Sequence, residues 1–259
     1  MTAELVAIDP CAPTRSIVDF VSRVAAAAVR HPNGHPWHLR PVDHGYEIRA
    51  DHSRGTRLTG LGARTVRLTV GAALLNLRLA VAVSGHQPVV AWSFDRPRSD
   101  VVAVVRRGVQ LDPTPVERAL FTVIAPGTST RRLSGVPPLA TAVLGRARSA
   151  VEAEGVWLRS VVGQDQDLRG PSFAAVPRSA HLVAIGGNHD VPGVHLRAGL
   201  ALQRLVLTVQ ALGWRASVAA WLPDLAAVLH LPRAIGGPGL WPQVVVAIDQ
   251  RSDDVPGEA

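Results

Sequence analysis

The chain has 259 residues, of which 47% are hydrophobic and 18% are charged, so it contains enough apolar material for a full core. All 27 basic residues are arginines, and they exceed the 20 acidic residues to give a formal net charge of +7. The absence of lysine excludes pyridoxal enzymes and Walker-type nucleotide hydrolases, because both need a lysine amine. Arginine is therefore the main anion-binding side chain, although a composition rich in Ala, Arg and Gly is also typical of high-GC coding.

The first part of the chain alternates between helical and extended patterns. Ser16 begins an apolar periodic segment and Asp19 follows three residues later, a variant of the capping box that predicts a helix over Ser16–Arg30. Three prolines then exclude a helix over His31–Pro41, where we expect an extended, turning loop. The pattern further predicts a strand at Tyr46–Ala50, a helix at Val66–Ser84, and strands near Val89–Trp92 and Asp100–Arg106.

The segment Leu111–Pro138 is rich in proline and glycine and is interpreted as the boundary between two halves. After it, the pattern predicts helices at Leu139–Glu154, Leu196–Leu212 and Asp224–Leu231, strands at Val156–Val162, His181–Gly186 and Gln243–Ile248, and a polar insertion at Gln164–Pro177. Helices alternating with few strands favour an α+β fold in which helices pack over a mixed sheet.

Two helical segments resemble each other at a distance of 128 positions. Gly71–Gly85 and Gly199–Gly213 both run from glycine to glycine over the same length, and several apolar positions are identical in register. The similarity indicates one fold unit duplicated and fused, with halves 1–127 and 128–259 forming one compact unit. The alternative is that any two buried helices rich in Leu, Ala and Val look alike.

A short motif gives this duplication a family explanation. His31–Leu39 reads HPNGHPWHL and resembles the PS-x-x-N-x-QPW-x-F loop of the flavin-dependent nitroreductases. The following residues and the Gly71 helix are similar to the Acg-like branch, whose members are two nitroreductase halves fused in one chain. Further similarities to that branch are Thr130-Arg131-Arg132, the segment that starts at Leu196, and Pro242-Gln243.

The resemblance implies a three-layer nitroreductase-like fold that holds FMN between the halves. Its implied cofactor-binding residues are Arg131 and Arg132 for the phosphate and ribityl chain, Asn33 for the pyrimidine edge of the flavin, His35 where the family has Gln, Trp37, and Gln243. Trp37 either walls the site or fills the core. The implied reaction passes hydride from NAD(P)H through the flavin to a small acceptor, and needs no catalytic residue from the protein.

This chain also departs from the family pattern. Val29 and Arg30 replace the Pro-Ser of the loop, and Ala247 stands where the last strand usually carries an arginine. The alternative function is therefore a degenerate protein of the same fold that stores flavin or serves as a noncatalytic partner. We expect either a small-molecule acceptor or a partner protein, and either a monomer or a homodimer.

The other patterns point away from further functions. His31, His35 and His38 share one loop but lack a nearby carboxylate or thiolate to complete a metal site, so no metal is expected. The glycines of Gly60–Gly62 and Gly236–Gly239 are interpreted as turns. Only 4% of residues are aromatic, which argues against nucleic-acid binding. An acidic amino terminus and apolar runs broken by charge predict a cytoplasmic protein without a membrane span.

Overall fold

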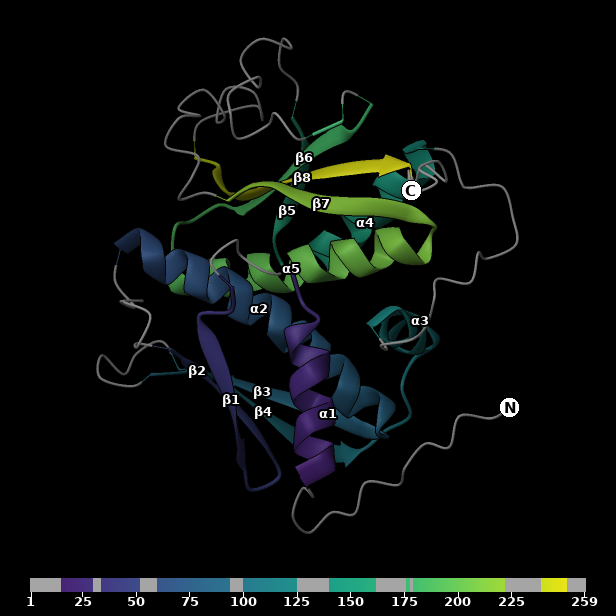
Figure 1. Cartoon of the computed structure of the whole chain (residues 1–259). Coiled ribbons are helices and arrows are strands. Elements are labelled where there is room, and N and C mark those ends of the chain that lie inside the picture. The colour runs from purple at the N-terminus through teal and green to yellow at the C-terminus, as the bar shows by residue number, and fades with distance from the viewer. Residues whose placement is uncertain are drawn as a thin grey trace, which may run out of the picture.

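The computed structural model describes residues 15–29, 34–51, 60–93, 100–124, 140–161, 176–177, 179–221 and 239–250. These residues form an α+β fold with two four-stranded sheets on either side of a central pair of helices (Figure 1). All strand pairs within both sheets are antiparallel. The expectation of an α+β fold is confirmed, whereas the expectation of a mixed sheet is wrong.

The first sheet has the strand order β1-β2-β4-β3. Its helical neighbours pack on the face that carries the apolar side chains of alternate strand residues. In chain order the elements are α1 (Arg15–Ala26), β1 (Trp37–Val42), β2 (Gly45–Ala50), α2 (Gly60–Val83), β3 (His86–Trp92), β4 (Val101–Gln110) and α3 (Pro115–Ile124).

The second sheet has the equivalent strand order, β5-β6-β8-β7. Its elements are α4 (Ala140–Glu152), β5 (Trp157–Ser160), β6 (His181–Gly187), α5 (Pro192–Ala211), β7 (Trp214–Trp221) and β8 (Trp241–Gln250). Both parts of the chain therefore have the same order of elements. A helix and two strands come first, and a long buried helix and two further strands follow. Each long helix ends two residues before a glycine with positive φ, Gly85 at 82° and Gly213 at 79°, a conformation that favours glycine.

The two long helices, α2 and α5, cross at a pair of glycines in the centre of the molecule. A Cβ atom on Gly71 would clash with the carbonyl oxygen of Leu196 and lie 2.9 Å from the Cα of Gly199. A Cβ atom on Gly199 would clash in the same way with the carbonyl oxygen of Leu68. Each long helix also contributes a leucine to the core beneath the opposite sheet. Leu68 of α2 packs in the core of the second sheet, and Leu196 of α5 packs in the core of the first. The backbones approach this closely only because neither position carries a side chain.

A buried polar network fastens this crossing to α1. The Asn76 amide nitrogen donates to the carbonyl of Val24 at 2.8 Å, and its amide oxygen accepts from Gln203 at 3.0 Å. The Gln203 oxygen in turn accepts from the backbone N–H of Val29 at 2.9 Å. Asn76 and Gln203 are 0% and 2% exposed, so these bonds satisfy polar groups that water does not reach.

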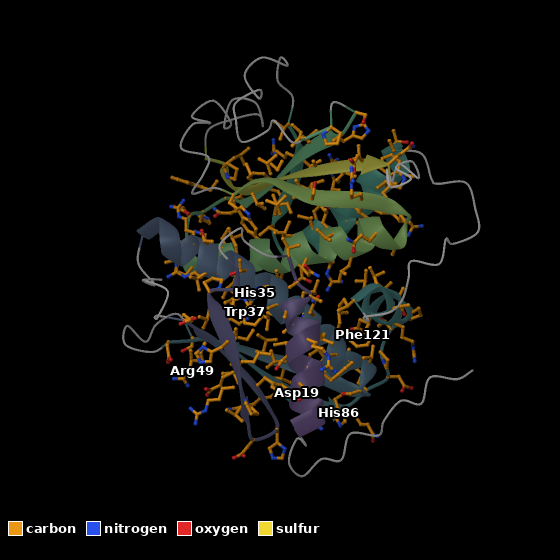
Figure 2. The ribbon with its side chains drawn as sticks, viewed as in Figure 1. Asp19, His35, Trp37, Arg49, His86 and Phe121 are labelled. Carbon is orange, nitrogen blue, oxygen red and sulfur yellow. The ribbon has the colours of Figure 1, made fainter. Side chains whose placement is uncertain are left out.

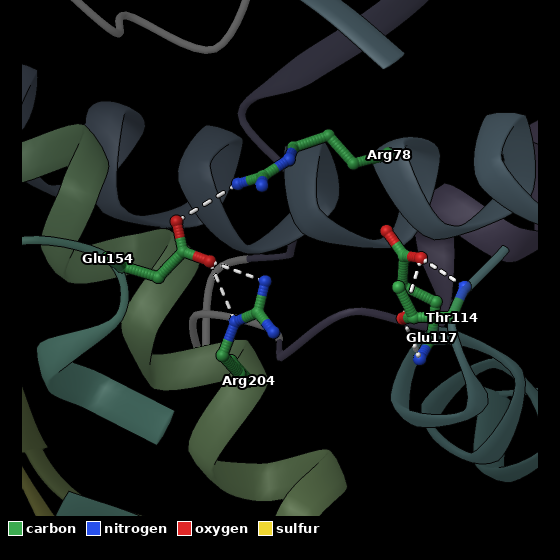
Figure 3. Close-up of polar contacts among 5 residues, drawn as sticks. All are labelled: Arg78, Thr114, Glu117, Glu154 and Arg204. Carbon is green, nitrogen blue, oxygen red and sulfur yellow. Dashed lines mark hydrogen bonds and ion pairs between the residues drawn. The ribbon is translucent and has the colours of Figure 1, made fainter. Parts of the chain in front are cut away.

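A second polar connection lies near the turn that follows α4. Figure 3 shows Glu154 between Arg78 of α2 and Arg204 of α5, with ion-pair distances of 2.9 Å and 2.6 Å. The side chain of Glu154 is only 7% exposed, so its carboxylate is buried with a guanidinium partner on each oxygen atom, and the trio keeps one net positive charge. The same view shows Thr114 and Glu117 forming a reciprocal capping box at the start of α3.

Several element predictions need correction. The Gly60–Gly62 segment is the first turn of α2 and not a turn between elements, because the apolar helical period outweighs the low helix propensity of two glycines. Trp37–Pro41 belongs to a strand and not to a loop.

Helix α3 lies inside the expected boundary segment, where Pro115 occupies the first helical position and needs no N–H partner. Strand β7 was not expected, and the predicted Asp224–Leu231 helix and most of the Gln164–Pro177 insertion lie outside the described residues.

One helix of the described part, Gly62–Val83, is long and apolar enough to span a membrane by composition. The structure buries 78% of that apolar window inside the fold. Its hydrophobicity is therefore explained by its place between two sheets, which is compatible with a soluble protein.

Candidate functional site

A cluster of ionisable groups lies where the amino-terminal part of α2 meets the loop between β6 and α5. Arg64 of α2 forms an ion pair with Asp190, which stands in that loop. Asp190 also binds His195 in the first turns of α5, with 2.8 Å between the carboxylate and Nε2. The side chains of Arg64 and Asp190 are 21% and 18% exposed. We call Arg64, Arg67, Asp190 and His195 the seam cluster, because its members come from both parts of the chain.

His195 is the most buried member of the seam cluster, with 4% of its side chain exposed. Burial lowers the pKa of the imidazole, and the nearby charges of Arg64 and Arg67 lower it further, against the opposite effect of the Asp190 carboxylate. The second ring nitrogen, Nδ1, is buried and has no hydrogen-bond partner among the described residues. Burial therefore favours the neutral form of His195, Asp190 orients the ring through Nε2, and Nδ1 is left without a hydrogen bond among the described residues.

The positive character of the seam cluster has two sources. Burial and the like charge of Arg64 lower the pKa of the Arg67 guanidinium, which shows that two cations share a partly dehydrated place. In addition, α5 begins at Pro192 after the N-cap residue Val191, and no side chain caps this end. The helix dipole therefore adds partial positive charge beside His195. This combination suits an anionic ligand.

Two of the sequence-predicted residues, His35 and Trp37, lie together where the chain enters β1. Their ring centroids are 4.8 Å apart, and Figure 2 shows them at the end of β1 that is nearest to α2. His35 Nε2 forms a hydrogen bond with the carbonyl of Ala26 at 3.1 Å, so this imidazole ties the loop to the end of α1. Trp37 is 8% exposed and belongs to the core of the first sheet, although its indole N–H finds no acceptor among the described residues.

Gln243 lies in the other sheet, at an irregularity of β8. Val244 pairs with Ile185 and Pro242 pairs with Gly186, so Gln243 is the extra residue of a bulge. It is 0% exposed, its amide nitrogen donates to the carbonyl of Trp241 at 3.3 Å, and its amide oxygen has no described partner. Gln243 thus belongs to β8 of the second sheet, whereas Trp37 belongs to the core of the first.

The remaining predicted residues, Asn33, Arg131 and Arg132, lie outside the described residues, as do His31 and Arg30. Their assignment to the flavin stays a prediction. Among the described residues, no group of three or more His, Cys, Asp or Glu side chains is arranged to hold a metal ion.

The sequence reasoning did not select any member of the seam cluster. Arg64 and Asp190 are 126 positions apart and meet only because α2 and α5 cross. One local signal was present, since Asp190 precedes Pro192 and His195, a pattern typical of a helix start. No pattern in the sequence indicated that this start faces two arginines.

No family model matches this chain, and no curated protein matches it. The interpretation of the site therefore depends on its geometry and on the motif resemblance.

Proposed function

We propose that this chain is an FMN-binding protein of the nitroreductase type, which passes hydride from NAD(P)H through the flavin to a small acceptor. The observation that carries the proposal is the seam cluster, where Arg64 from the first part of the chain meets Asp190 and His195 from the second. The motif resemblance implies a cofactor between two fused halves, and the seam cluster is a partly buried, positively charged site between the two parts.

The duplication on which this proposal depends has independent support. The two sheets share one strand order, and the long helices end at residues 128 positions apart. The contacts at the crossing are reciprocal, because Gly71 faces Leu196 while Gly199 faces Leu68. Reciprocal contacts of this kind are typical of two-fold interfaces between identical subunits. We therefore interpret the chain as two copies of one unit joined end to end.

The donors of the seam cluster fit the chemistry of FMN. Its phosphate carries up to two negative charges, which guanidinium groups bind as planar forks. Arg64 and Arg67 would supply this charge from α2, together with the predicted Arg131 and Arg132. Asn33 and His35 are proposed for the polar edge of the ring. The bound flavin supplies the hydride chemistry, while the residues of the chain bind it, orient it and exclude water.

A noncatalytic flavin-storing or partner protein is the second candidate function. It is favoured by the hydrogen bond between His35 and Ala26, because that bond engages the ring nitrogen of the residue that replaces the family glutamine. Trp37 is likewise packed in the core. These contacts would reduce the number of groups that hold the flavin ring and would weaken binding and turnover.

The test is the flavin content of the purified chain, before and after incubation with FMN. We expect at most one flavin per chain, measured by absorbance against protein concentration. Arg64→Ala with Arg67→Ala should lower FMN affinity roughly tenfold or more, because charge-assisted hydrogen bonds are lost. Arg146→Ala with Arg148→Ala is the matched control, since both arginines are exposed on α4 and their loss removes the same two charges elsewhere.

Each outcome separates the candidates. Oxidation of NADH or NADPH by the flavin-loaded chain, with a nitroaromatic or quinone acceptor, supports the oxidoreductase. Bound FMN without such turnover supports the noncatalytic protein. A folded chain that takes up no FMN at millimolar concentration rejects both.

A further inference from the structure

The buried imidazole of His195 is the feature that the proposed flavin chemistry does not use. Asp190 holds its Nε2 at 2.8 Å, while Nδ1 is buried without a described partner. The residue is 3% exposed, and it lies in the first turns of a 20-residue helix whose amino-terminal end has no side-chain cap. An unpartnered nitrogen beside such a helix end is a place that a ligand can complete.

The partner on Nε2 determines what Nδ1 can do. An ionised carboxylate only accepts hydrogen bonds, so Nε2 carries the hydrogen that is donated to Asp190. In the neutral ring, Nδ1 is then a lone-pair acceptor. The charged groups that act on the imidazole are Arg64 and Arg67 from α2 and Asp190 from the preceding loop, and the fourth group is the amino-terminal end of α5, which begins three residues before His195. Three of these four disfavour a proton on Nδ1 as long as the site holds no anion.

An anion in the seam cluster reverses this balance. Its negative charge compensates Arg64 and the helix dipole, and its oxygen atoms accept a hydrogen bond from a protonated Nδ1. We propose that Asp190, His195 and Arg64 form an oxyanion-binding site that takes up a proton when a phosphate-like anion binds. The proton comes from solvent and adds to Nδ1, so the imidazole changes from neutral to singly positive and donates to the anion.

The inference deepens the proposed function, because it concerns the cluster that we assign to the cofactor. It rests on that function only for the identity of the natural ligand, a phosphate monoester. The binding of a simple inorganic oxyanion tests the site without flavin.

Sulfate is the probe, because it has the shape of phosphate but does not titrate near neutral pH. Sulfate binding is measured by calorimetry at a pH of about 7 in two buffers with different enthalpies of ionisation. The difference between the two observed enthalpies gives the number of protons that the complex takes up. We expect uptake approaching one proton per sulfate, because the imidazole is neutral before binding and charged afterwards.

Two variants assign the proton to a residue. His195→Gln keeps a polar side chain of similar size but cannot titrate, so it should bind sulfate several-fold more weakly and without proton uptake. His38→Gln is the matched control, since His38 is exposed on β1, and it should keep the uptake of the parent chain. If His195→Gln does not fold, nitrogen NMR of the parent chain with labelled histidine reports directly whether sulfate protonates one buried ring.

The outcomes are decisive for each proposal. Absence of sulfate binding, binding without proton uptake, or uptake that persists in His195→Gln overturns the oxyanion site. If FMN still binds when any one of these results is obtained, the proposed function stands without the oxyanion site. If sulfate binds with proton uptake while FMN neither binds nor competes, the flavin assignment fails and the oxyanion site stands.

Discussion

Replacing Gly71 with alanine is expected to push α2 and α5 apart at the point where they cross. The added Cβ would clash with the Leu196 carbonyl oxygen and lie 2.9 Å from the Gly199 Cα, whereas carbon atoms pack at about 3.5–4.0 Å. Both opposing atoms belong to the α5 backbone, so no side-chain rotation relieves the clash. The helices must move apart by roughly 1 Å, which weakens dispersion contacts along their whole crossing.

The expected cost is about 3 kcal/mol, at the upper end of the range for overpacked cores. Alanine favours an isolated helix by about 1 kcal/mol over glycine, so the intrinsic effect has the opposite sign and is smaller. For a chain of this size, the loss corresponds to a fall in Tm of roughly 6–12 °C. Thermal and urea unfolding of the parent and the variant measure it.

Gly145→Ala provides the control for helix propensity. Gly145 lies in α4, is exposed, and has nothing within 4 Å of the position of an added Cβ, so this variant should gain about 0.5–1 kcal/mol. The double variant Gly71→Ala with Gly199→Ala should cost less than the sum of the two single changes, because both act on one crossing. Equal stabilisation by Gly71→Ala and Gly145→Ala would refute the close packing of α2 against α5.

Two further predictions concern the buried polar groups. Asn76→Ala and Gln203→Ala should each destabilise the fold by about 1–3 kcal/mol, because each change leaves a buried partner unsatisfied. In denaturant unfolding, the double variant should show a coupling energy of at least about 0.5 kcal/mol between the two positions. Strictly additive losses would contradict the network that joins α1, α2 and α5. The lowered folded-state pKa of His195 predicts that its contribution to stability is fully present above about pH 6.5, the unfolded value, and is lost as the pH falls through the folded pKa. His195→Gln should remove that component, so the difference in unfolding free energy between parent and variant should shrink on acidification. A difference that is constant with pH would show that this imidazole stays in one charge state.

The elements that could be predicted from the sequence are those whose signal is local and repeated. The helix Pro192–Ala211 was predicted over Leu196–Leu212 from its apolar period, which did not extend to its first turn. The strand Gly45–Ala50 was predicted over Tyr46–Ala50 from its alternation. Helix α3 was missed because its prolines at 113 and 115 resemble a linker, while in the structure Thr114 and Glu117 cap a helix that Pro115 begins.

The candidate site was less predictable because its parts are brought together by tertiary structure. Arg64 has no feature in the sequence that distinguishes it from the other arginines, and its role depends on the crossing angle and register of α2 and α5. His35 was selected from a motif, and the structure adds a contact with Ala26 that the motif does not contain. Charge balance at a site depends on spatial neighbours, which spacing along one chain does not report.

Joining two copies of one unit in a single chain removes a constraint that applies to every symmetric dimer. In a homodimer, residues related by the two-fold axis must be identical, so two positions that face each other across it carry the same side chain. Under the proposed duplication, Arg67 and His195 occupy equivalent positions of α2 and α5, and the charge of the Arg67 guanidinium acts on the His195 imidazole. A fused chain of this kind would keep a permanent charge at one position and a titratable ring at its counterpart. Under both proposals, one position of this interface would hold an anion and the equivalent position would exchange a proton, a combination that a symmetric homodimer cannot form.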